Sequence, residues 1–313
     1  MPTLGKMAPT LLLPPIGLGG WVFGGGYDWG PLDKPAAANA ICVALEMGIN
    51  LLDTAPVYGD GESERFIGSV LKGRRSQVIL ASKCGLLKNG SWTDHNLRPA
   101  FIRTQLEGSL RRLQTDYIDL YQIHYPDPKI PLEEAVEELE RLRQSGKIRA
   151  IGLCNVSAEQ VRSCVQVGDI FSVQNEYSLL HPQHGQEVLP VCGELGISFI
   201  GYGTLCGGIL SGKHKTAPNL RRADARNYFY KCYRGETFDR AQQTVIRVKQ
   251  VAQHKGCKAA EVAIAWARGQ TGVSCVLCGA RHEEQVRQNA AARILCLTQQ
   301  ELNFLAGTVD DYQ

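Results

Sequence analysis

The chain has 313 residues, of which 44% are hydrophobic and 21% charged, so it is long and apolar enough to bury a large core and is not a disordered chain. Its apolar runs are shorter than the roughly 20 residues of a membrane helix, and its first residues lack the cleavage pattern of a signal peptide. A net charge of +3 is too balanced to favour nucleic acid or a membrane surface as a partner.

Short runs of β-forming residues alternate with helical patterns along the chain. Several runs, such as residues 78–81, are apolar throughout, which is typical of parallel strands buried on both faces. The eight predicted strands are, in chain order, Pro15–Leu18, Asn50–Asp53, Val78–Ser82, Ile118–Ile123, Arg149–Leu153, Phe171–Gln174, Ser198–Tyr202 and Ser274–Leu277. Eight β/α units predict an α/β fold, a single-domain (β/α)8 TIM barrel over residues 1–313. An open doubly wound sheet remains the alternative at this point.

Amphipathic helices are predicted between the strands. Two of them carry an apolar stripe: Ile102, Leu106, Leu110 and Leu113 in the first, and Leu132, Val136, Leu139 and Leu142 in the second. Gly146 then predicts the end of the second helix. The longest stretch without a clear pattern runs from residue 214 to about 237, and ordered loops of that length are usually functional.

Two glycine-rich segments resemble phosphate-binding loops. Residues 17–22 carry the first two glycines of a dinucleotide fingerprint, but Val22 replaces the third, which excludes a Rossmann site. Residues 207–214 match a Walker A loop until His214, which replaces the hydroxyl residue that would hold Mg²⁺. Backbone N–H groups and Lys213 can still bind a phosphate. The segment is therefore either a phosphate loop without nucleotide hydrolysis or a glycine-rich turn.

Four polar side chains lie at or just after the carboxyl ends of consecutive predicted strands. Asp53, Lys83 and His124 end or follow three strands, and Tyr58 lies in the loop behind Asp53. Taken singly, each has a structural explanation as a helix cap, a surface lysine, a buried histidine or a loop aromatic. In a barrel, however, the strand ends converge on the face that carries active sites. Their coincidence predicts a catalytic centre.

The four groups suit the transfer of a proton to a carbonyl oxygen. A phenol has a pKa of about 10, and a nearby ammonium favours the phenolate and lowers that value. A carboxylate keeps the ammonium charged and oriented, and a histidine can fix a carbonyl oxygen by a hydrogen bond. Because no side chain supplies hydride, a redox cofactor is required.

Several long segments resemble the aldo-keto reductase superfamily. The matching segments are residues 48–59, Ser63-Glu64, and residues 116–124, 146–152 and 279–289. The resemblance extends from Gly17 to about Ala291, and within the superfamily it is greatest to the bacterial branch that includes the general-purpose reductases and the inositol-cluster protein. It implies a (β/α)8 barrel that binds NADP(H) in extended form and reduces small aldehydes or ketones reversibly. It leaves the oligomeric state open.

The resemblance also gives the strand-end residues their roles. Tyr58 would be the proton donor, Lys83 the partner that lowers its pKa, Asp53 the partner of the lysine, and His124 the residue that orients the substrate. Two other functions stay open. One is a cofactor-sensing binding subunit with vestigial catalysis, and the other is an NAD-dependent sugar or polyol dehydrogenase.

The cofactor contacts follow from the same resemblance. Asn155 and Gln174 would hold the nicotinamide carboxamide, Tyr202 would stack on the ring, and Arg281 would contact the 2′-phosphate, which suits a guanidinium. Alternatively, Arg281 is a surface residue at a helix start. The complete implied set is Gly20, Trp21, Asp53, Cys154, Asn155, Gln174, Tyr202, Gly203, Thr204, Leu205, Gly208, Lys213, Arg226, Gly279, Arg281, Gln285 and Asn289.

The 11 cysteines show no zinc-finger spacing with histidine, so we expect reduced thiols, no bound metal and a cytoplasmic protein. Two cysteines stand where the family usually has other residues: Cys154 replaces a serine and Cys278 replaces a proline. Gly203-Thr204 likewise replaces the usual Ser-Pro. Loss of a serine hydroxyl at Cys154 predicts weaker cofactor binding. Four cysteines fall near strand ends, Cys84, Cys154, Cys206 and Cys278. They are either redox-sensitive thiols near Lys83 or, as we favour, small residues that fill tight positions.

Substrate identity depends on loops whose shape the sequence does not give. The loops concerned are residues 21–29, 88–96 and 214–237. Trp21, Trp29 and Trp92 predict either an aromatic-walled pocket for a sugar or an aryl aldehyde, or packing against the barrel rim.

Overall fold

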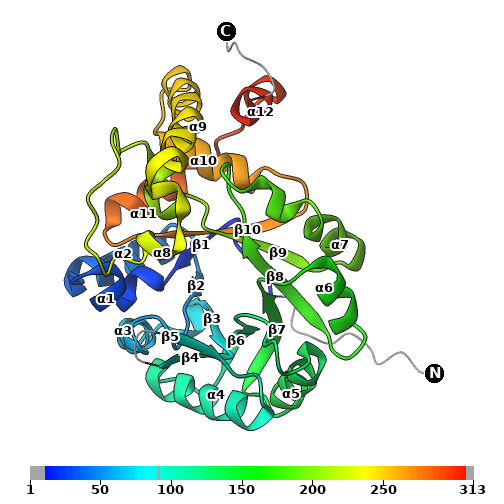
Figure 1. Cartoon of the computed structure of the whole chain (residues 1–313). Coiled ribbons are helices and arrows are strands. Elements are labelled where there is room, and N and C mark those ends of the chain that lie inside the picture. Colours follow the sequence, from blue (N-terminus) through cyan, green and yellow to red (C-terminus); the bar gives the residue numbers. More distant parts are fainter. Residues whose placement is uncertain (1–10, 90–91, 308–313) are drawn as a thin grey trace.

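Eight parallel strands close into a barrel in the computed structural model, which describes residues 11–89 and 92–307 (Figure 1). The strand order around the barrel is β1, β10, β9, β8, β7, β6, β3 and β2, and β2 pairs again with β1. The strands are β1 Ile16–Gly19, β2 Leu51–Asp53, β3 Ile79–Cys84, β6 Ile118–Ile123, β7 Ile148–Cys154, β8 Ile170–Glu176, β9 Ser198–Tyr202 and β10 Val273–Gly279. All eight predicted strands are present, the predicted barrel is confirmed, and the open doubly wound sheet is wrong.

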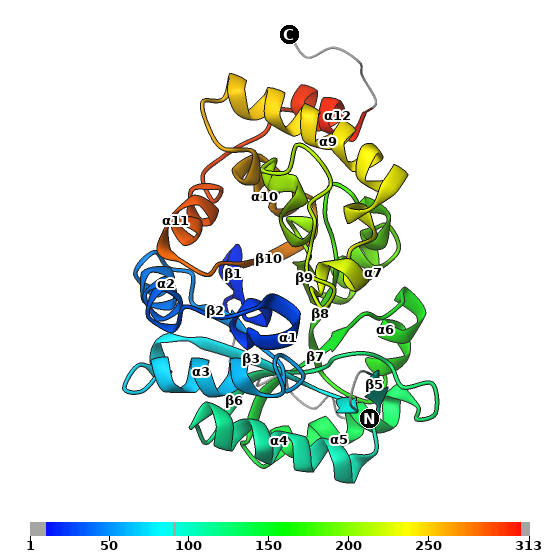
Figure 2. The same cartoon turned by 60° about the vertical axis from the view of Figure 1, so that its left-hand side comes forward.

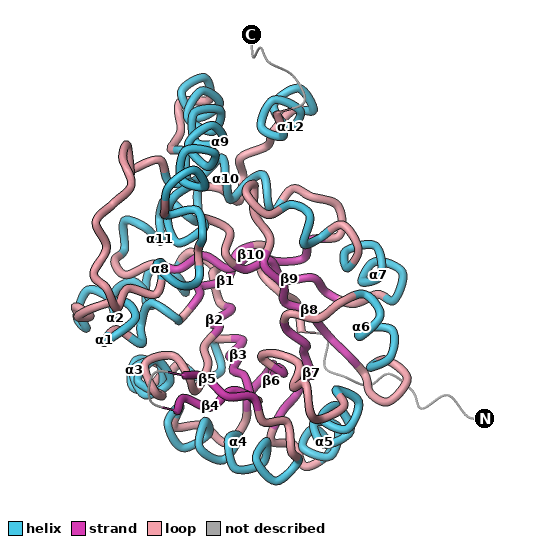
Figure 3. The backbone as a smooth tube through the Cα atoms, in the orientation of Figure 1, coloured by secondary structure: helices cyan, strands magenta, loops and turns pink. Residues whose placement is uncertain are grey.

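Helices cover the outside of this ring of strands, as Figures 2 and 3 show from two directions. The longer ones are α2 Lys34–Glu46, α3 Glu62–Val70, α4 Pro99–Leu113, α5 Leu132–Gln144, α6 Ala158–Cys164, α7 Val188–Leu195, α9 Gly235–His254, α10 Ala259–Arg268, α11 Glu283–Ala291 and α12 Gln299–Ala306. The short ones are α1 Gly26–Trp29, α8 Arg226–Phe229 and the 3-10 turns η1 Trp21–Gly24, η2 Arg75–Gln77, η3 Pro182–Gly185, η4 Cys206–Ser211 and η5 Lys231–Tyr233.

The apolar patterns of the sequence account for this layering. Every residue of β3 and β6 is buried, because the barrel interior covers one face and the helices cover the other. Helices α4 and α5 bury the two predicted stripes. Gly146 follows α5 with φ +79°, a left-handed conformation that glycine adopts without a steric penalty. The predicted helix end is therefore confirmed.

The connection that follows β3 contains an antiparallel hairpin, β4 Leu86–Asn89 and β5 Trp92–His95, which the sequence patterns did not predict. The sequence also showed no clear pattern in residues 214–237. In the structure this stretch contains α8 and η5 and the start of α9 at Gly235. Residues of both segments line the same cavity at the carboxyl ends of the barrel strands.

No helix within residues 11–89 and 92–307 is long and apolar enough to cross a membrane. The same residues hold no cluster of three or more histidine, cysteine or acidic side chains that could bind a metal. The spacing Cys275-x-x-Cys278 is that of many redox pairs, but both residues lie on β10, where residues three apart face opposite sides. Cys275 packs inside the barrel and Cys278 in the layer under the helices.

Candidate active site

A cavity of about 1520 Å³ opens where the carboxyl ends of the strands meet. Asp53, Tyr58 and His124 line it, and Lys83 lies directly behind its wall with only 1% of its surface exposed. Of the predicted cofactor contacts, Cys154 alone does not line this cavity. Those that do are Gly20, Trp21, Asp53, Asn155, Gln174, Tyr202, Gly203, Thr204, Leu205, Gly208, Lys213, Arg226, Gly279, Arg281, Gln285 and Asn289. The structure thus brings residues from the whole length of the chain to one site.

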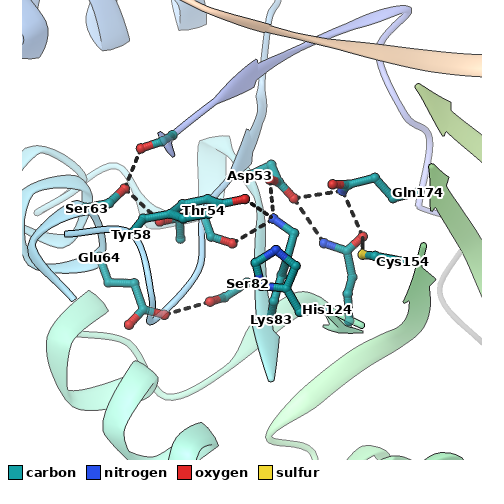
Figure 4. A network of polar contacts seen from close by, with 12 residues as sticks. Asp53, Thr54, Tyr58, Ser63, Glu64, Ser82, Lys83, His124, Cys154 and Gln174 are labelled. Carbon is teal, nitrogen blue, oxygen red and sulfur yellow. Dashed lines mark hydrogen bonds and ion pairs between the residues drawn. The ribbon is translucent and has the colours of Figure 1, made fainter. Parts of the chain in front are cut away.

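The Lys83 ammonium holds the centre together (Figure 4). Its Nζ donates to Asp53 Oδ2 at 2.5 Å and to the carbonyl oxygen of Thr54 at 3.0 Å. It also lies 3.3 Å from the hydroxyl oxygen of Tyr58. Strands β2 and β3 are neighbours with Asp53 opposite Ala81, so Lys83, two residues further along β3, reaches past the end of β2. The pairing of these two strands therefore sets the ion pair.

The turn that carries Tyr58 is fixed by close backbone packing. Gly59 has φ +61°, and a Cβ there would lie 2.2 Å from the carbonyl oxygen of Gly24, so only glycine fits. The Ser63 hydroxyl donates to the carbonyl oxygen of Gly20 at 2.7 Å and lies 2.8 Å from the Thr54 hydroxyl. These contacts join the segments on both sides of the tyrosine and hold its ring at the cavity wall.

Burial and charge set the protonation states. Burial raises the pKa of Tyr58 to about 12, although the Lys83 ammonium acts to lower it. The sequence predicted a lowered pKa; Lys83 has the predicted sign, but burial outweighs it. Burial lowers the pKa of Lys83, yet Asp53 and Tyr58 more than offset this and leave it raised. Burial, followed by the charge of Lys83, holds the pKa of His124 well below its usual value. At neutral pH the centre therefore contains a phenol, an ammonium and a neutral imidazole.

Gln122 is a site residue that the sequence reasoning missed. From β6, its Nε2 donates to Asp53 Oδ1 at 3.0 Å, and its Oε1 accepts from Gln174 Nε2 at 3.0 Å. Gln174 Nε2 also donates to Asp53 Oδ1 at 3.0 Å, so both of its amide protons are used. The Oε1 atom of Gln174 is thereby left as an acceptor at the cavity wall. A polar residue inside the otherwise apolar end of β6, two positions before His124, was the available signal.

A second buried network supports β3 from behind. The Glu64 side chain is fully buried, and its Oε1 accepts from the Ser82 hydroxyl at 2.6 Å (Figure 4). Its Oε2 accepts from Arg112 Nε of α4 at 2.7 Å. Because Ser82 precedes Lys83 on β3, this ion pair ties the strand that carries the lysine to α3 and α4.

Asn155 and Tyr202 form another part of the cavity wall. Asn155 has φ +58°, and its Nδ2 donates to the carbonyl oxygen of His124 at 2.8 Å. Its Oδ1 accepts from the hydroxyl of Tyr202 at 2.7 Å. The Cys154 thiol instead donates to Gln122 Oε1 at 3.6 Å, inside the barrel. The residue before Asn155 thus supports the buried amides and does not face the cavity.

The Walker-like segment forms η4 and lies along the far part of the cavity. Gly207 and Gly208 adopt φ values of +64° and +107°, which breaks the helical geometry. The Tyr233 hydroxyl donates to the carbonyl oxygen of Gly207 at 2.6 Å, which fastens the loop to η5. Lys213 lines the cavity beside these glycines. Lys213 thus brings an ammonium to the cavity, while the backbone N–H groups of Gly208 and Leu210 donate within the loop to the carbonyl oxygen of Leu205.

Two guanidinium groups flank this end of the cavity. Arg226 donates to both carboxylate oxygens of Asp224, at 2.8 and 2.7 Å. Arg281 donates to the carbonyl oxygen of Trp29 at 3.2 Å and to that of Pro31. Its backbone N–H donates to Gln285 Oε1 at 2.8 Å. Arg281 is therefore a wall residue that connects the end of β10 to the loop before α2.

The strand-end thiols fit the packing explanation better than the redox one. Cys84, Cys154, Cys206 and Cys278 are all buried. Burial raises the pKa of Cys278 to about 12 and also raises those of Cys84 and Cys154, and for Cys154 the nearby Lys83 does not reverse the shift. The reactive thiolate form is therefore disfavoured at these positions.

Aromatic rings cover the catalytic end of the cavity. Trp21 stacks against Tyr58 with the ring centres 6.0 Å apart, and Trp29 meets Trp21 edge-on at 5.3 Å. Both tryptophans line the cavity, as the aromatic-walled alternative requires. The side chain of Trp92, the third tryptophan of that prediction, lies outside the described part of the structure.

A closed (β/α)8 barrel with a phenol, an imidazole and a buried ammonium at a cavity at its strand ends is the arrangement of a barrel enzyme. Comparison with known proteins gives the family. Residues 15–309 match the aldo/keto reductase family model, and the chain belongs to this family of oxidoreductases.

Two curated relatives share much of the chain. Aldo-keto reductase YhdN of Bacillus subtilis is 39% identical over 275 residues, which are 87% of this chain and 82% of the relative. The NADH-specific methylglyoxal reductase of Escherichia coli is 36% identical over 299 residues, 90% of each chain.

Solved structures agree with the fold. Glycerol dehydrogenase AKR11B4 from Gluconobacter oxydans superposes with a TM-score of 0.87 at 32% identity, over 96% of this chain and 93% of that one. An aldo/keto reductase from Klebsiella pneumoniae, solved with NADP and acetate, has a TM-score of 0.72 at 27% identity, over 95% of this chain and 91% of that one.

Proposed function

We propose that the protein is an NADP(H)-dependent reductase that converts small aldehydes or ketones to alcohols, reversibly. The observation that carries the proposal is the Tyr58 hydroxyl, which lies 3.3 Å from the Lys83 ammonium at the wall of a cavity that His124 also lines. A neutral phenol beside a buried cation can give up its proton as negative charge develops on a carbonyl oxygen.

The cavity fits a nicotinamide dinucleotide. Gln174 Oε1 is kept as an acceptor for a carboxamide N–H, because Asp53 and Gln122 use both protons of its Nε2. The glycine-rich loop, through Gly203, Gly207 and Gly208, and three cations, Lys213, Arg226 and Arg281, line the wall beyond it. When bound, the nicotinamide supplies hydride to the carbonyl carbon.

The residues of the chain supply the proton and the orientation. The substrate carbonyl accepts a hydrogen bond from the neutral His124 imidazole, which fixes its oxygen next to Tyr58. The Tyr58 hydroxyl then donates its proton to that oxygen, and Lys83 stabilises the phenolate that remains. Asp53 keeps the ammonium in place throughout. In the opposite direction, the phenolate accepts the proton of an alcohol.

The experiment that tests this role is Tyr58→Phe. The variant removes the proton donor but keeps the ring that packs on Trp21. We expect NADPH affinity to change less than threefold, while kcat for aldehyde reduction falls by about 10²–10⁴. Fluorescence titration measures the affinity, and NADPH absorbance measures the rate. Retained turnover contradicts the assignment, and tight NADPH binding by the wild type without any turnover would favour the cofactor-sensing subunit.

The preference for NADP(H) rests on Arg281, the guanidinium at the cavity wall. We expect Arg281→Ala to weaken NADPH binding at least tenfold and NADH binding less than threefold, because a guanidinium pairs strongly with a phosphate dianion. Equal titration curves for both cofactors in the wild type and the variant would instead favour an NAD-dependent enzyme. The Escherichia coli relative is named as NADH-specific, which makes this comparison informative.

A further inference from the structure

The hairpin β4–β5 presents one face to the cavity. Its cross-strand pairs place Leu86 opposite His95 and Lys88 opposite Thr93. Since side chains alternate along a strand, these four lie on the same face. All four line the cavity. Leu87, between the two β4 residues, faces away and is 41% exposed.

The base of the hairpin is fixed to the barrel. Gln105 of α4 accepts from the backbone N–H of Gly85 at 2.7 Å and donates to the carbonyl oxygen of Leu86 at 2.7 Å. His95 Nδ1 lies 2.9 Å from the carbonyl oxygen of Pro126, in the connection after β6. The polar face of the hairpin is therefore held in a defined position at the cavity.

Lys88 brings a positive charge to this part of the wall. It is half-buried, and its Nζ lies 5.9 Å from the centre of the Tyr27 ring. No ion pair of Lys88 occurs within residues 11–89 and 92–307. Asp28, which follows Tyr27 in the sequence, also lines the cavity. Its carboxylate accepts a hydrogen bond from Trp21 Nε1 at 3.3 Å through Oδ2. A cation that lines a cavity without a carboxylate partner is a suitable site for an anionic group.

Thr93 and His95 are the neighbours of Lys88 on this face. Because His95 Nδ1 donates to the carbonyl oxygen of Pro126, Nε2 of the neutral ring is an acceptor, so the Thr93 hydroxyl is the second group that can donate to an anion. Imidazole, hydroxyl and ammonium groups from His95, Thr93 and Lys88 thus share one face. Lys88 and Tyr58 both line the cavity but make no direct contact. A ligand that meets both must carry a spacer between its carbonyl and its anionic end.

We propose that the hairpin is an oxyanion subsite, and that the substrate is an aldehyde or ketone with a carboxylate or phosphate separated from the carbonyl by a short or aromatic spacer. This inference rests on the proposed reductase function. Lys88 binds the oxyanion and the Thr93 hydroxyl donates to it, while Tyr58 and His124 bind the carbonyl. The aromatic wall of Trp21 suits a flat spacer.

The experiment compares two aldehydes of equal shape, 4-carboxybenzaldehyde and its neutral analogue 4-carbamoylbenzaldehyde, with NADPH. In the wild type we expect a higher kcat/KM for the carboxylate. Lys88→Met should lower kcat/KM for the carboxylate about tenfold, mainly through KM, since one charge-assisted contact is lost. It should change the value for the amide less than twofold. Lys88→Arg should restore most of the preference.

Leu87→Met is the matched control, because it changes the opposite face of the same strand; it should leave both substrates unchanged. If Lys88→Met lowers both substrates equally, or neither, the subsite is refuted while the reductase function stands. Absence of turnover of both aldehydes by the wild type refutes the function and the subsite together. Succinic semialdehyde against butanal, and glyceraldehyde 3-phosphate against glyceraldehyde, then show whether a carboxylate or a phosphate is preferred.

Discussion

Two carboxylates end strands of the same barrel but sit in opposite surroundings. Asp53, at the end of β2, accepts from the Lys83 ammonium at 2.5 Å and from the amides of Gln122 and Gln174. Glu176, at the end of β8, has His181 as its ion-pair neighbour at 3.8 Å, and that side chain is charged only when protonated. Burial raises the pKa of Glu176 to about 7.

The difference shows that a strand-end position does not by itself define a role. A buried carboxylate stays useful as an anion only where a cation and hydrogen-bond donors replace water. Around Asp53 that replacement is complete, and the same groups carry the predicted chemistry. Around Glu176 the effect of burial dominates, and the pKa of that carboxyl is raised. Removing partners from Asp53, or the charge from Glu176, tests this contrast.

The largest effect is expected for Lys83→Met. The variant leaves Asp53 as a buried charge without its cation, which costs about 3–5 kcal/mol in the free energy of unfolding. It also removes the group that stabilises the Tyr58 phenolate, so kcat should fall by about 10³. Urea unfolding and NADPH oxidation rates measure the two effects.

The double variant Asp53→Asn/Lys83→Met separates these two roles of the lysine. With both charges removed, most of the lost stability should return, because no buried ion remains unpaired. Activity should stay low, because the phenolate still lacks its cation. Recovery of activity in the double variant would show that Lys83 serves stability alone.

An intermediate effect is expected for Gln122→Leu. Asp53 keeps Lys83, but Gln174 loses the acceptor for one of its amide protons. One or two unsatisfied buried groups cost about 2 kcal/mol in the free energy of unfolding. If Gln122 orients Gln174 toward the carboxamide, NADPH affinity should also fall roughly tenfold. Gln253→Leu, on the exposed face of α9, is the control; loss of stability without loss of affinity would limit Gln122 to a structural role.

The smallest effect on activity is expected for Glu176→Gln, whose effect on stability depends on pH. The pKa of Glu176 is about 7 in the folded protein and about 4.3 in an unfolded chain. Between these values the folded protein holds a proton that the unfolded chain has lost. The free energy of unfolding should therefore fall as pH rises through this window, by about 1 kcal/mol per pH unit. The variant should remove this slope in urea unfolding from pH 5 to 8, and Glu159→Gln, an exposed control, should not.

Much of the fold could be read from local patterns. The strand at residues 78–82 and the stripes of α4 and α5 follow from apolar spacing, which local burial enforces. The four candidate catalytic positions could be predicted because parallel strands end on a common face. The cofactor set came from the resemblance to aldo-keto reductases. All of it except Cys154 lines the cavity.

The remaining features depend on contacts between segments far apart in the chain. Gln122 belongs to the site through Asp53, 69 residues earlier, and Gln174, 52 residues later. The hairpin β4–β5 contains Lys88 and Asp94, which weakened its apolar alternation in the sequence. The pKa of Tyr58 depends on the balance of burial against one ammonium, and burial is known only after folding.

The sequence by itself thus determined the barrel and the four candidate catalytic positions, because apolar periodicity and strand-end positions are properties of neighbouring residues. It determined the family through the segments that resemble aldo-keto reductases. Only the tertiary structure decided that Cys154 faces away from the cavity, how the amides around Asp53 are oriented and where Lys88 lies. Those features depend on which residues from distant segments come into contact in the closed barrel and on how deeply they are buried. A pattern of neighbouring residues does not give this information.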